Sequence, residues 1–198
     1  MSPPPSGGGP SEDDESPTEV REYASRAVDY VKRSLELTLE YDSETLPVLD
    51  HYLREVPGDN AAAAHLVAAT AGAYFGEVVK RRIGGTWDLP SHDPGAWRLV
   101  LPCGVWFSPA AMALAAIRGP SQADDDMLDA DEGTDPNVQI SPEWDASLHA
   151  PPQLRGVVAE VLERMAGVSP ETFYSLCGRL DTLEHVQSVL AGIASERN

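Results

Sequence analysis

The stretch AAAAHLVAATAGAYFGEVVKRR, which runs from Ala61 to Arg82, decides the fold of this chain. It holds no Asp, Glu, Lys or Arg up to Gly76, then reaches one acid, Glu77, and ends in a basic run that begins at Lys80. A helix that is apolar on every face belongs in a core, because no face of it gains from contact with water. We therefore expect a buried central helix against which the other elements pack.

The residues before this stretch predict two further helices. Ser16, Pro17 and Glu19 have the pattern of a helix start, in which Ser16 caps and Glu19 completes a capping box. The helix that follows is predicted to run to about Tyr41 and to be amphipathic, with a charged, solvent-exposed face and an apolar face. A second helix is predicted over about residues 42–56, and the Pro-Gly pair after it ends it. Short connections favour antiparallel packing of neighbouring helices.

The residues after the central helix change from helical to strand periodicity. Gly84 and Gly85 mark the end of the helix. Three short segments then have the composition of strands, namely residues 86–90, 97–101 and 104–107. Ser108 and Pro109 begin another helix, which is predicted to end near Arg118. Because strands are indicated in this window alone, we expect a small antiparallel β-hairpin or a three-stranded sheet covered by helices.

The last part of the chain is helical again. Apolar residues recur with helical spacing from Leu154 onward, and Ser169 with Pro170 begins another helix. Asp181 and Glu184 form a second capping box, which predicts one more helix start. The predicted fold class is therefore α+β, mostly α: a helical bundle around a buried central helix, with a small antiparallel β-hairpin or three-stranded sheet.

Composition divides the chain into four parts. Residues 1–15 are rich in Pro, Gly and Ser and then acidic, so we expect a disordered acidic tail. Residues 16–118 form the predicted α+β core domain. Residues 119–150 have no hydrophobic period and are predicted to be an acidic flexible connector. Residues 151–198 are predicted to be C-terminal helices that pack on the core.

The acidic charge is concentrated in two of these parts. The formal net charge is −18, yet residues 59–120 are close to neutral, whereas residues 121–150 hold nine acids and no base. A charge of this sign repels nucleic acid and anionic membrane surfaces, so we expect neither as a partner. It suits solubility or a partner protein with a basic surface. Nothing in the sequence predicts an oligomeric state.

The cysteines and the N-terminal sequence indicate in which cellular compartment the protein is expected. Cys103 and Cys177 are far apart and too few for a disulfide framework, so two buried free thiols in a reducing cytosol are favoured. The N-terminus lacks the basic and apolar regions of a signal peptide. The longest uncharged stretch is shorter than the ~20 residues of a membrane span. We therefore expect a cytoplasmic protein.

The acidic run DDDMLDADEGTD, residues 124–135, raises the possibility of a calcium site. An EF-hand loop needs Gly at position 6 and Glu at position 12. Counted from Asp129, Gly133 falls at position 5 and Ile140 at position 12, so the pattern fails. No metal or cofactor is predicted, and a solvated charge run is favoured. We predict an acidic interaction segment made of Asp124, Asp125, Asp126, Asp129, Asp131 and Glu132.

Glu77 is the residue most suggestive of a binding site, because a lone buried carboxylate is costly. Arg81 follows it at i+4, and Arg82, Trp87 and His92 come shortly after. One interpretation is a polar pocket lined by these residues beside the hairpin. The other is that Glu77 pairs with a neighbouring base and has a structural role. We favour the structural role, because ion pairs of this kind also occur without function. No catalytic residue is predicted, since no catalytic motif occurs.

A resemblance extends over about residues 70–118. The segment carries Gly72, then Tyr74 to Glu77, then Gly84-Gly85-x-Trp87, then a hairpin that ends at Ser108-Pro109. This order resembles uncharacterised bacterial domains of unknown function. The resemblance implies an α+β order and a bacterial source, and it brings no activity and no catalytic residues.

These observations predict a non-enzymatic acidic protein-interaction module of a bacterium. One alternative is an immunity-type protein that neutralises a basic toxin, which the size and the acidity fit. Another is an enzyme of unknown reaction with a polar pocket near Glu77 and Trp87. The first reading is favoured because the negative charge lies outside the core and no catalytic motif accompanies it.

Overall fold

Helix α3, Ala61–Ile83, is the centre of the fold, as predicted. Every residue from Ala71 to Val79 is buried, so this part of the helix has neighbours on all sides. Its first turn is capped by Asn60, whose side chain accepts a hydrogen bond from the Ala63 backbone N–H at 3.1 Å. The apolar composition of the helix is therefore matched by its place in the core.

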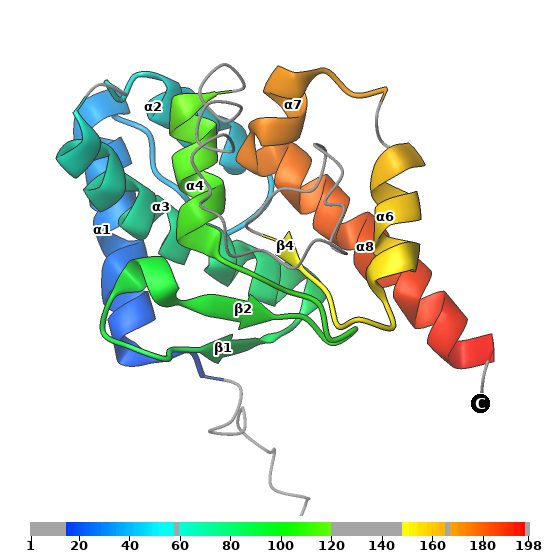
Figure 1. The fold of residues 1–198 in the computed structure, drawn as a ribbon. Helices are drawn as coiled ribbons and strands as arrows, with labels where there is room; N and C mark the ends of the chain where they lie inside the picture. Colours follow the sequence, from blue (N-terminus) through cyan, green and yellow to red (C-terminus); the bar gives the residue numbers. More distant parts are fainter. Residues whose placement is uncertain (1–14, 58–59, 120–147, 165–166, 197–198) are drawn as a thin grey trace, which may run out of the picture.

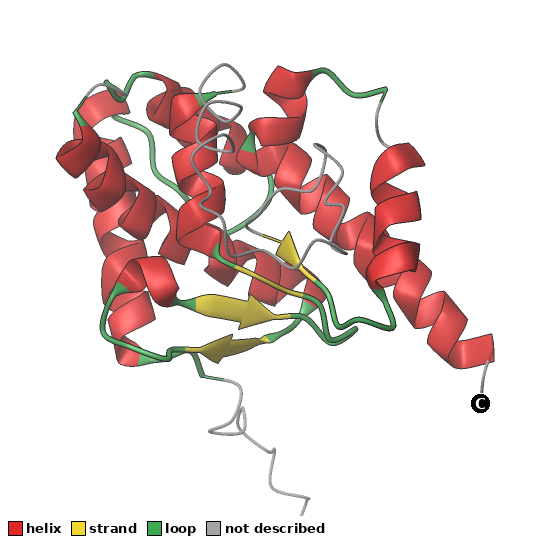
Figure 2. Ribbon diagram, viewed as in Figure 1, coloured by secondary structure: helices red, strands yellow, loops and turns green. Residues whose placement is uncertain are grey.

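The computed structural model describes residues 15–57, 60–119, 148–164 and 167–196 (Figure 1). Within these residues the chain is α+β and mostly helical, and the small sheet lies at one edge of the group of helices (Figure 2). The helices are α1 (Thr18–Leu35), α2 (Leu46–Arg54), α3, α4 (Pro109–Arg118), α6 (Arg155–Arg164), α7 (Pro170–Tyr174) and α8 (Leu176–Glu196), with a 3-10 turn η2 (Pro94–Ala96). The strands are β1 (Thr86–Asp88), β2 (Arg98–Val100), β3 (Trp106–Phe107) and β4 (Leu148–His149).

The sheet is antiparallel throughout, with the strand order β1-β2-β3-β4. The first three strands are the predicted ones. The fourth is a correction, because Leu148 and His149 fall inside the region predicted to be a flexible connector. Trp106 lies between Arg98 of β2, whose Cζ is 4.4 Å from the ring centroid, and His149 of β4, whose ring stacks on it at 3.8 Å. This stack adds side-chain contacts to the short pairing of β4.

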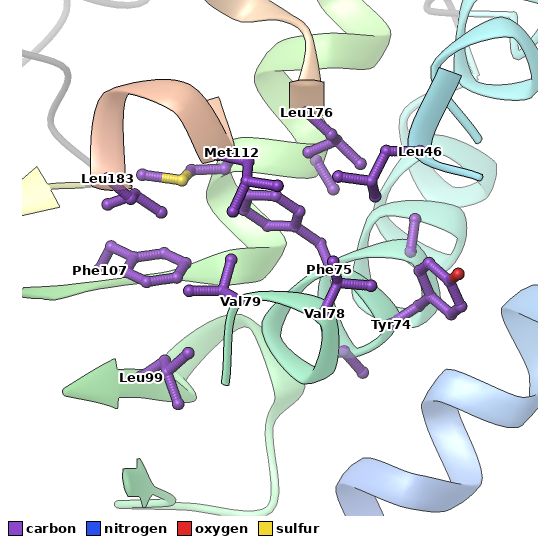
Figure 3. Close-up of a cluster of buried hydrophobic side chains, with 14 of the residues drawn as sticks. Leu46, Tyr74, Phe75, Val78, Val79, Leu99, Phe107, Met112, Leu176 and Leu183 are labelled. Atoms are coloured by element: carbon purple, nitrogen blue, oxygen red, sulfur yellow. The ribbon is translucent and has the colours of Figure 1, made fainter. Parts of the chain in front are cut away.

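The core face of the sheet packs toward α3. Leu99, Phe107 and Leu148 are buried, while the residues beside them in each strand are more exposed, as strand alternation requires. The rings of Phe75 and Phe107 meet edge to face at 6.1 Å between centroids. Figure 3 shows this cluster, in which side chains of α3 gather with others from α2, α4, α8 and the sheet.

Small residues on α3 permit the close approach of its neighbours. A Cβ atom placed on Gly72 would lie 2.6 Å from backbone atoms of Ala110, at the start of α4. Real Cβ atoms do not come so close, so α4 can occupy its place only because this position is Gly. The first turn of α4 is itself capped by Ser108, whose hydroxyl accepts the Ala111 N–H at 3.3 Å.

Helix α1 is shorter than predicted and begins differently. It ends at Leu35, because Glu36 adopts a left-handed conformation with φ of 58°. The chain then turns inward and buries Leu39. Ser16 is not a cap, and its hydroxyl accepts instead from the Lys80 ammonium at 3.2 Å. In both places a tertiary contact prevails over the local helix signal.

The C-terminal helices differ from the prediction at one point. Ser169 caps α7 as expected, accepting from the Thr172 N–H at 3.3 Å. The predicted helix start at Asp181 is wrong, because α8 runs without a break from Leu176 to Glu196. The chain turns instead at Ser175, between α7 and α8. Gly178, in the first turn of α8, permits the close approach of the two helices, because a Cβ there would lie 1.9 Å from the Thr172 carbonyl oxygen.

Among the described residues, α3 is the one helix long and apolar enough to cross a membrane, judged by length and composition. The buried core helix of a soluble protein meets the same criterion. Twelve of the 23 residues of α3 are buried within this fold. Residues 1–14 and 120–147, which include most of the predicted tail and connector, lie outside the described residues.

The close contact at Gly72 predicts a stability effect. The Gly72→Ala variant forces α4 away from α3, and we expect its free energy of unfolding to fall by about 1–3 kcal/mol despite the better helix propensity of Ala. The matched control is Gly192→Ala in α8, where an added Cβ meets nothing within 4 Å. Urea denaturation should show no loss for this control, and equal losses for both variants would contradict the packing argument.

Candidate functional site

The predicted site residues Glu77 and Trp87 are brought together in the structure. The Glu77 side chain lies on the buried part of α3 and is 7% exposed, and Trp87 projects from β1 into the core at 9% exposed. The Trp87 indole N–H donates to Glu77 Oε1 at 2.8 Å. A buried carboxylate needs such a donor, because it has lost its hydrogen bonds to water.

Gly76 makes this contact possible. A Cβ atom on Gly76 would lie 2.3 Å from the Trp87 ring, so the indole occupies the space that a side chain would fill. Gly76 thus leaves space beside α3, and the next residue, Glu77, supplies a hydrogen-bond acceptor. The Trp87 ring of β1 fills that space, and its indole N–H donates to the Glu77 carboxylate.

Arg81 lies near this pair and contacts the loop after α1. Its Cζ is 4.5 Å from the centroid of the Tyr41 ring. The Tyr41 backbone has a φ of 58°, and its N–H donates to the Tyr74 hydroxyl at 2.9 Å. Burial raises the pKa of the Tyr41 hydroxyl, Arg81 opposes that rise, and Glu77 adds to it. Tyr41, Arg81 and Glu77 are therefore close enough to interact electrostatically.

Arg82 and His92 are not part of this group. Arg82 Nε donates to Glu184 Oε1 of α8 at 2.5 Å, on the exposed surface. His92 is exposed in the loop between β1 and β2. It lines a separate hollow with Glu19 and Trp97, to which Glu77, Arg81 and Trp87 do not contribute. The five predicted residues therefore divide into a buried pair with Arg81 beside it, a surface ion pair and a loop histidine.

Asp50 is a buried acid that the sequence prediction missed. It lies on α2 at 5% exposed, and its carboxylate accepts from the backbone N–H groups of Leu176, at 2.7 Å, and Cys177, at 3.1 Å. These are free donors of the first turn of α8, so Asp50 acts as a cap supplied by another helix. A signal was present, since Asp50 stands on the apolar face of α2, four residues after Leu46 and three before Leu53.

The Cys177 thiol is affected by the same acid. Burial, followed by the hydrogen bond and the negative charge of Asp50, raises the pKa of Cys177 to about 12 from the ordinary 9.0. Burial also raises the pKa of the Cys103 thiol. A thiol that keeps its proton is a poor nucleophile, so neither cysteine has the environment of a reactive one.

The described residues contain no group of three or more His, Cys, Asp and Glu side chains that could hold a metal ion. The predicted acidic interaction segment, from Asp124 to Glu132, lies outside the described residues. Comparison of the chain with protein-family models, with curated proteins and with solved structures gives no match. The resemblance to an uncharacterised bacterial domain therefore stays a prediction.

The buried hydrogen bond predicts a coupling between Glu77 and Trp87. Trp87→Phe removes the donor and leaves the carboxylate unsatisfied, so the free energy of unfolding should fall by about 2–3 kcal/mol. Glu77→Met in the Trp87→Phe background removes the stranded acceptor and should recover part of that loss. A double-mutant cycle by urea denaturation should give a coupling of about 1 kcal/mol or more, whereas additive losses would contradict the interaction.

The raised pKa values predict a loss of stability in alkali. Cys177 holds its proton more tightly in the folded chain, so its contribution is complete below pH 9.0 and disappears as the pH rises towards about 12. The free energy of unfolding should fall over this window by less than about 1.4 kcal/mol per pH unit for this thiol, since it is half-buried and partly screened. Urea denaturation of Cys177→Ala should give a shallower fall, and an unchanged slope would contradict the assignment.

Proposed function

We propose that this protein is a non-enzymatic interaction module that binds a partner protein through the partner's basic surface. The observation that carries the proposal is the charge distribution, with a net charge of −18 and nine acids without a base in residues 121–150. Charge of one sign concentrated in one segment of a chain steers an oppositely charged partner and selects against nucleic acid.

The arrangement of the described cations supports this proposal. Most arginines of the described chain are engaged within the molecule, by carboxylates or by aromatic rings. They are Arg21 with Glu15, Arg26 with Tyr23, Arg81 with Tyr41, Arg82 with Glu184, Arg98 with Asp88 and Trp106, Arg164 with Glu160, and Arg179 with Phe173 and Tyr174. Much of the positive charge of the described chain is therefore paired within the molecule.

Several exposed carboxylates have no such partner. Glu36, Glu40 and Glu55 make no ion pair with a cation of the described chain. What remains available on the surface for an incoming protein is thus mainly negative. The buried Glu77 carboxylate, on which the enzyme hypothesis rests, is occupied by the Trp87 indole at 2.8 Å, which favours a structural role over a catalytic one.

The acidic interaction segment is the part of the chain to test. The full chain is titrated against a fluorescent peptide of arginine, lysine and glycine, and compared with a variant in which six acids become amides: Asp124, Asp125, Asp126, Asp129, Asp131 and Glu132. Exposed pairs contribute about 0.2–1 kcal/mol each, so the variant should bind at least about tenfold more weakly. Its affinity should also depend less steeply on salt.

A matched control separates the segment from net charge. It neutralises six exposed acids of the described surface: Glu36, Glu40, Glu44, Glu55, Glu163 and Glu171. This control should lose clearly less affinity than the segment variant. Unchanged affinity in the segment variant, or equal losses in both, would overturn the role of the segment.

A further inference from the structure

The β1–β2 loop and the first turn of α1 line an open hollow of about 310 Å³. Its lining consists of Glu19 from α1 and Leu89, Pro90, Ser91, His92 and Trp97 from the loop. Ligand pockets begin at about 300 Å³, so a hollow of this size suits one side chain better than a large ligand.

The loop that forms the hollow is held in place by its own hydrogen bonds. The Trp97 indole N–H donates to the Ser91 carbonyl at 3.0 Å, and Asp93 Oδ1 accepts from the Gly95 N–H at 3.0 Å. From outside the loop, the Ser108 hydroxyl donates to the Gly95 carbonyl at 3.3 Å. The loop therefore does not have to be ordered on binding, which removes one cost of association.

An aromatic contact fixes the hollow to α1. The Trp97 ring packs edge to face against Tyr23, with the centroids 5.2 Å apart. Tyr23 is one helical turn after Glu19, so this contact sets the position of the Glu19 wall relative to the loop wall. The two walls are thus parts of one packed unit.

The lining combines an apolar wall with an unpaired acid. Leu89 and Pro90 supply most of the apolar surface, because Trp97 is only 3% exposed. Glu19 is exposed and forms no ion pair or side-chain hydrogen bond within the described residues. A long cationic side chain matches both features, because its methylene stem packs on apolar surface while its head meets a carboxylate. An anionic ligand would be repelled by Glu19.

We propose that this hollow is the anchor subsite that receives one arginine side chain of the basic partner. The guanidinium group pairs with the Glu19 carboxylate, and the stem lies against Leu89 and Pro90. Arginine is preferred over lysine because its planar head pairs with a carboxylate through two parallel hydrogen bonds. The inference rests on the proposed function and adds a specific recognition point to it.

The test uses small probes and the Trp97 indole as reporter. The full chain, labelled with ¹⁵N, is titrated with N-acetyl-arginine amide while the indole N–H resonances are followed, and Trp97→Phe serves only to assign the Trp97 signal. We expect this signal to shift and to saturate with a Kd near the millimolar range, as suits one side chain, about −4 kcal/mol. N-acetyl-citrulline amide, a neutral isostere, should leave it unshifted.

Two variants with the same change in net charge make the test specific. Glu19→Gln removes the acid of the hollow and should weaken binding of the arginine probe about fivefold, which corresponds to about 1 kcal/mol for one exposed pair. Glu22→Gln lies three residues further along α1, outside the hollow, and should leave binding unchanged. Equal losses in both variants, an equal response to citrulline, or no shift at tens of millimolar would overturn the proposal.

The remaining outcomes are also distinguishable. An equal affinity for N-acetyl-lysine amide would overturn the assignment to arginine. If the arginine probe fails to bind but the basic peptide still binds through the acidic segment, the anchor subsite is wrong and the proposed function stands. If the probe binds as expected but neutralising the segment leaves peptide affinity unchanged, the subsite stands and the role of the segment is wrong.

Discussion

The fold depends on a buried carboxylate that must find a donor. Glu77 lies in the most buried part of α3, and its carboxylate accepts a hydrogen bond from the Trp87 indole N–H at 2.8 Å. A buried acid without a partner would cost several kcal/mol, which is a large share of the stability of a small domain. The position of β1, and through its pairing that of the whole sheet, is therefore tied to one side chain of the central helix.

Two glycines of α3 are as important for the packing as this hydrogen bond. Gly76 leaves the space that the Trp87 ring fills, and Gly72 leaves the space in which α4 begins. Larger residues at either position would separate elements that now share one core. Asp50 performs a similar task for the C-terminal part, since it joins α2 to the first turn of α8 by two hydrogen bonds. Asp50 thus links elements that are 126 residues apart in the sequence, whereas Glu77 fixes the strand that directly follows α3.

On the surface, unlike in the core, several acids have no partner within the described chain. Many described arginines are held by acids or aromatic rings of the same molecule, while other exposed acids have no cation beside them. Exposed ion pairs add little to stability, so the main consequence of this pattern is a negative surface. In the hollow between α1 and the β1–β2 loop, such an acid stands beside apolar side chains. This combination distinguishes it from a uniformly charged surface.

The sequence by itself determined the α+β class, the buried central helix, the first three strands, and the caps at Ser108 and Ser169, because these follow from local periodicity and capping chemistry. It also singled out Glu77 and Trp87, although their contact could not be derived from spacing. Only the tertiary structure decided the end of α1 at Leu35, the fourth strand, the unbroken α8 and the cap supplied by Asp50. The fourth strand and the Asp50 cap depend on contacts between residues far apart in the chain, which the local propensities that a sequence pattern reports do not contain.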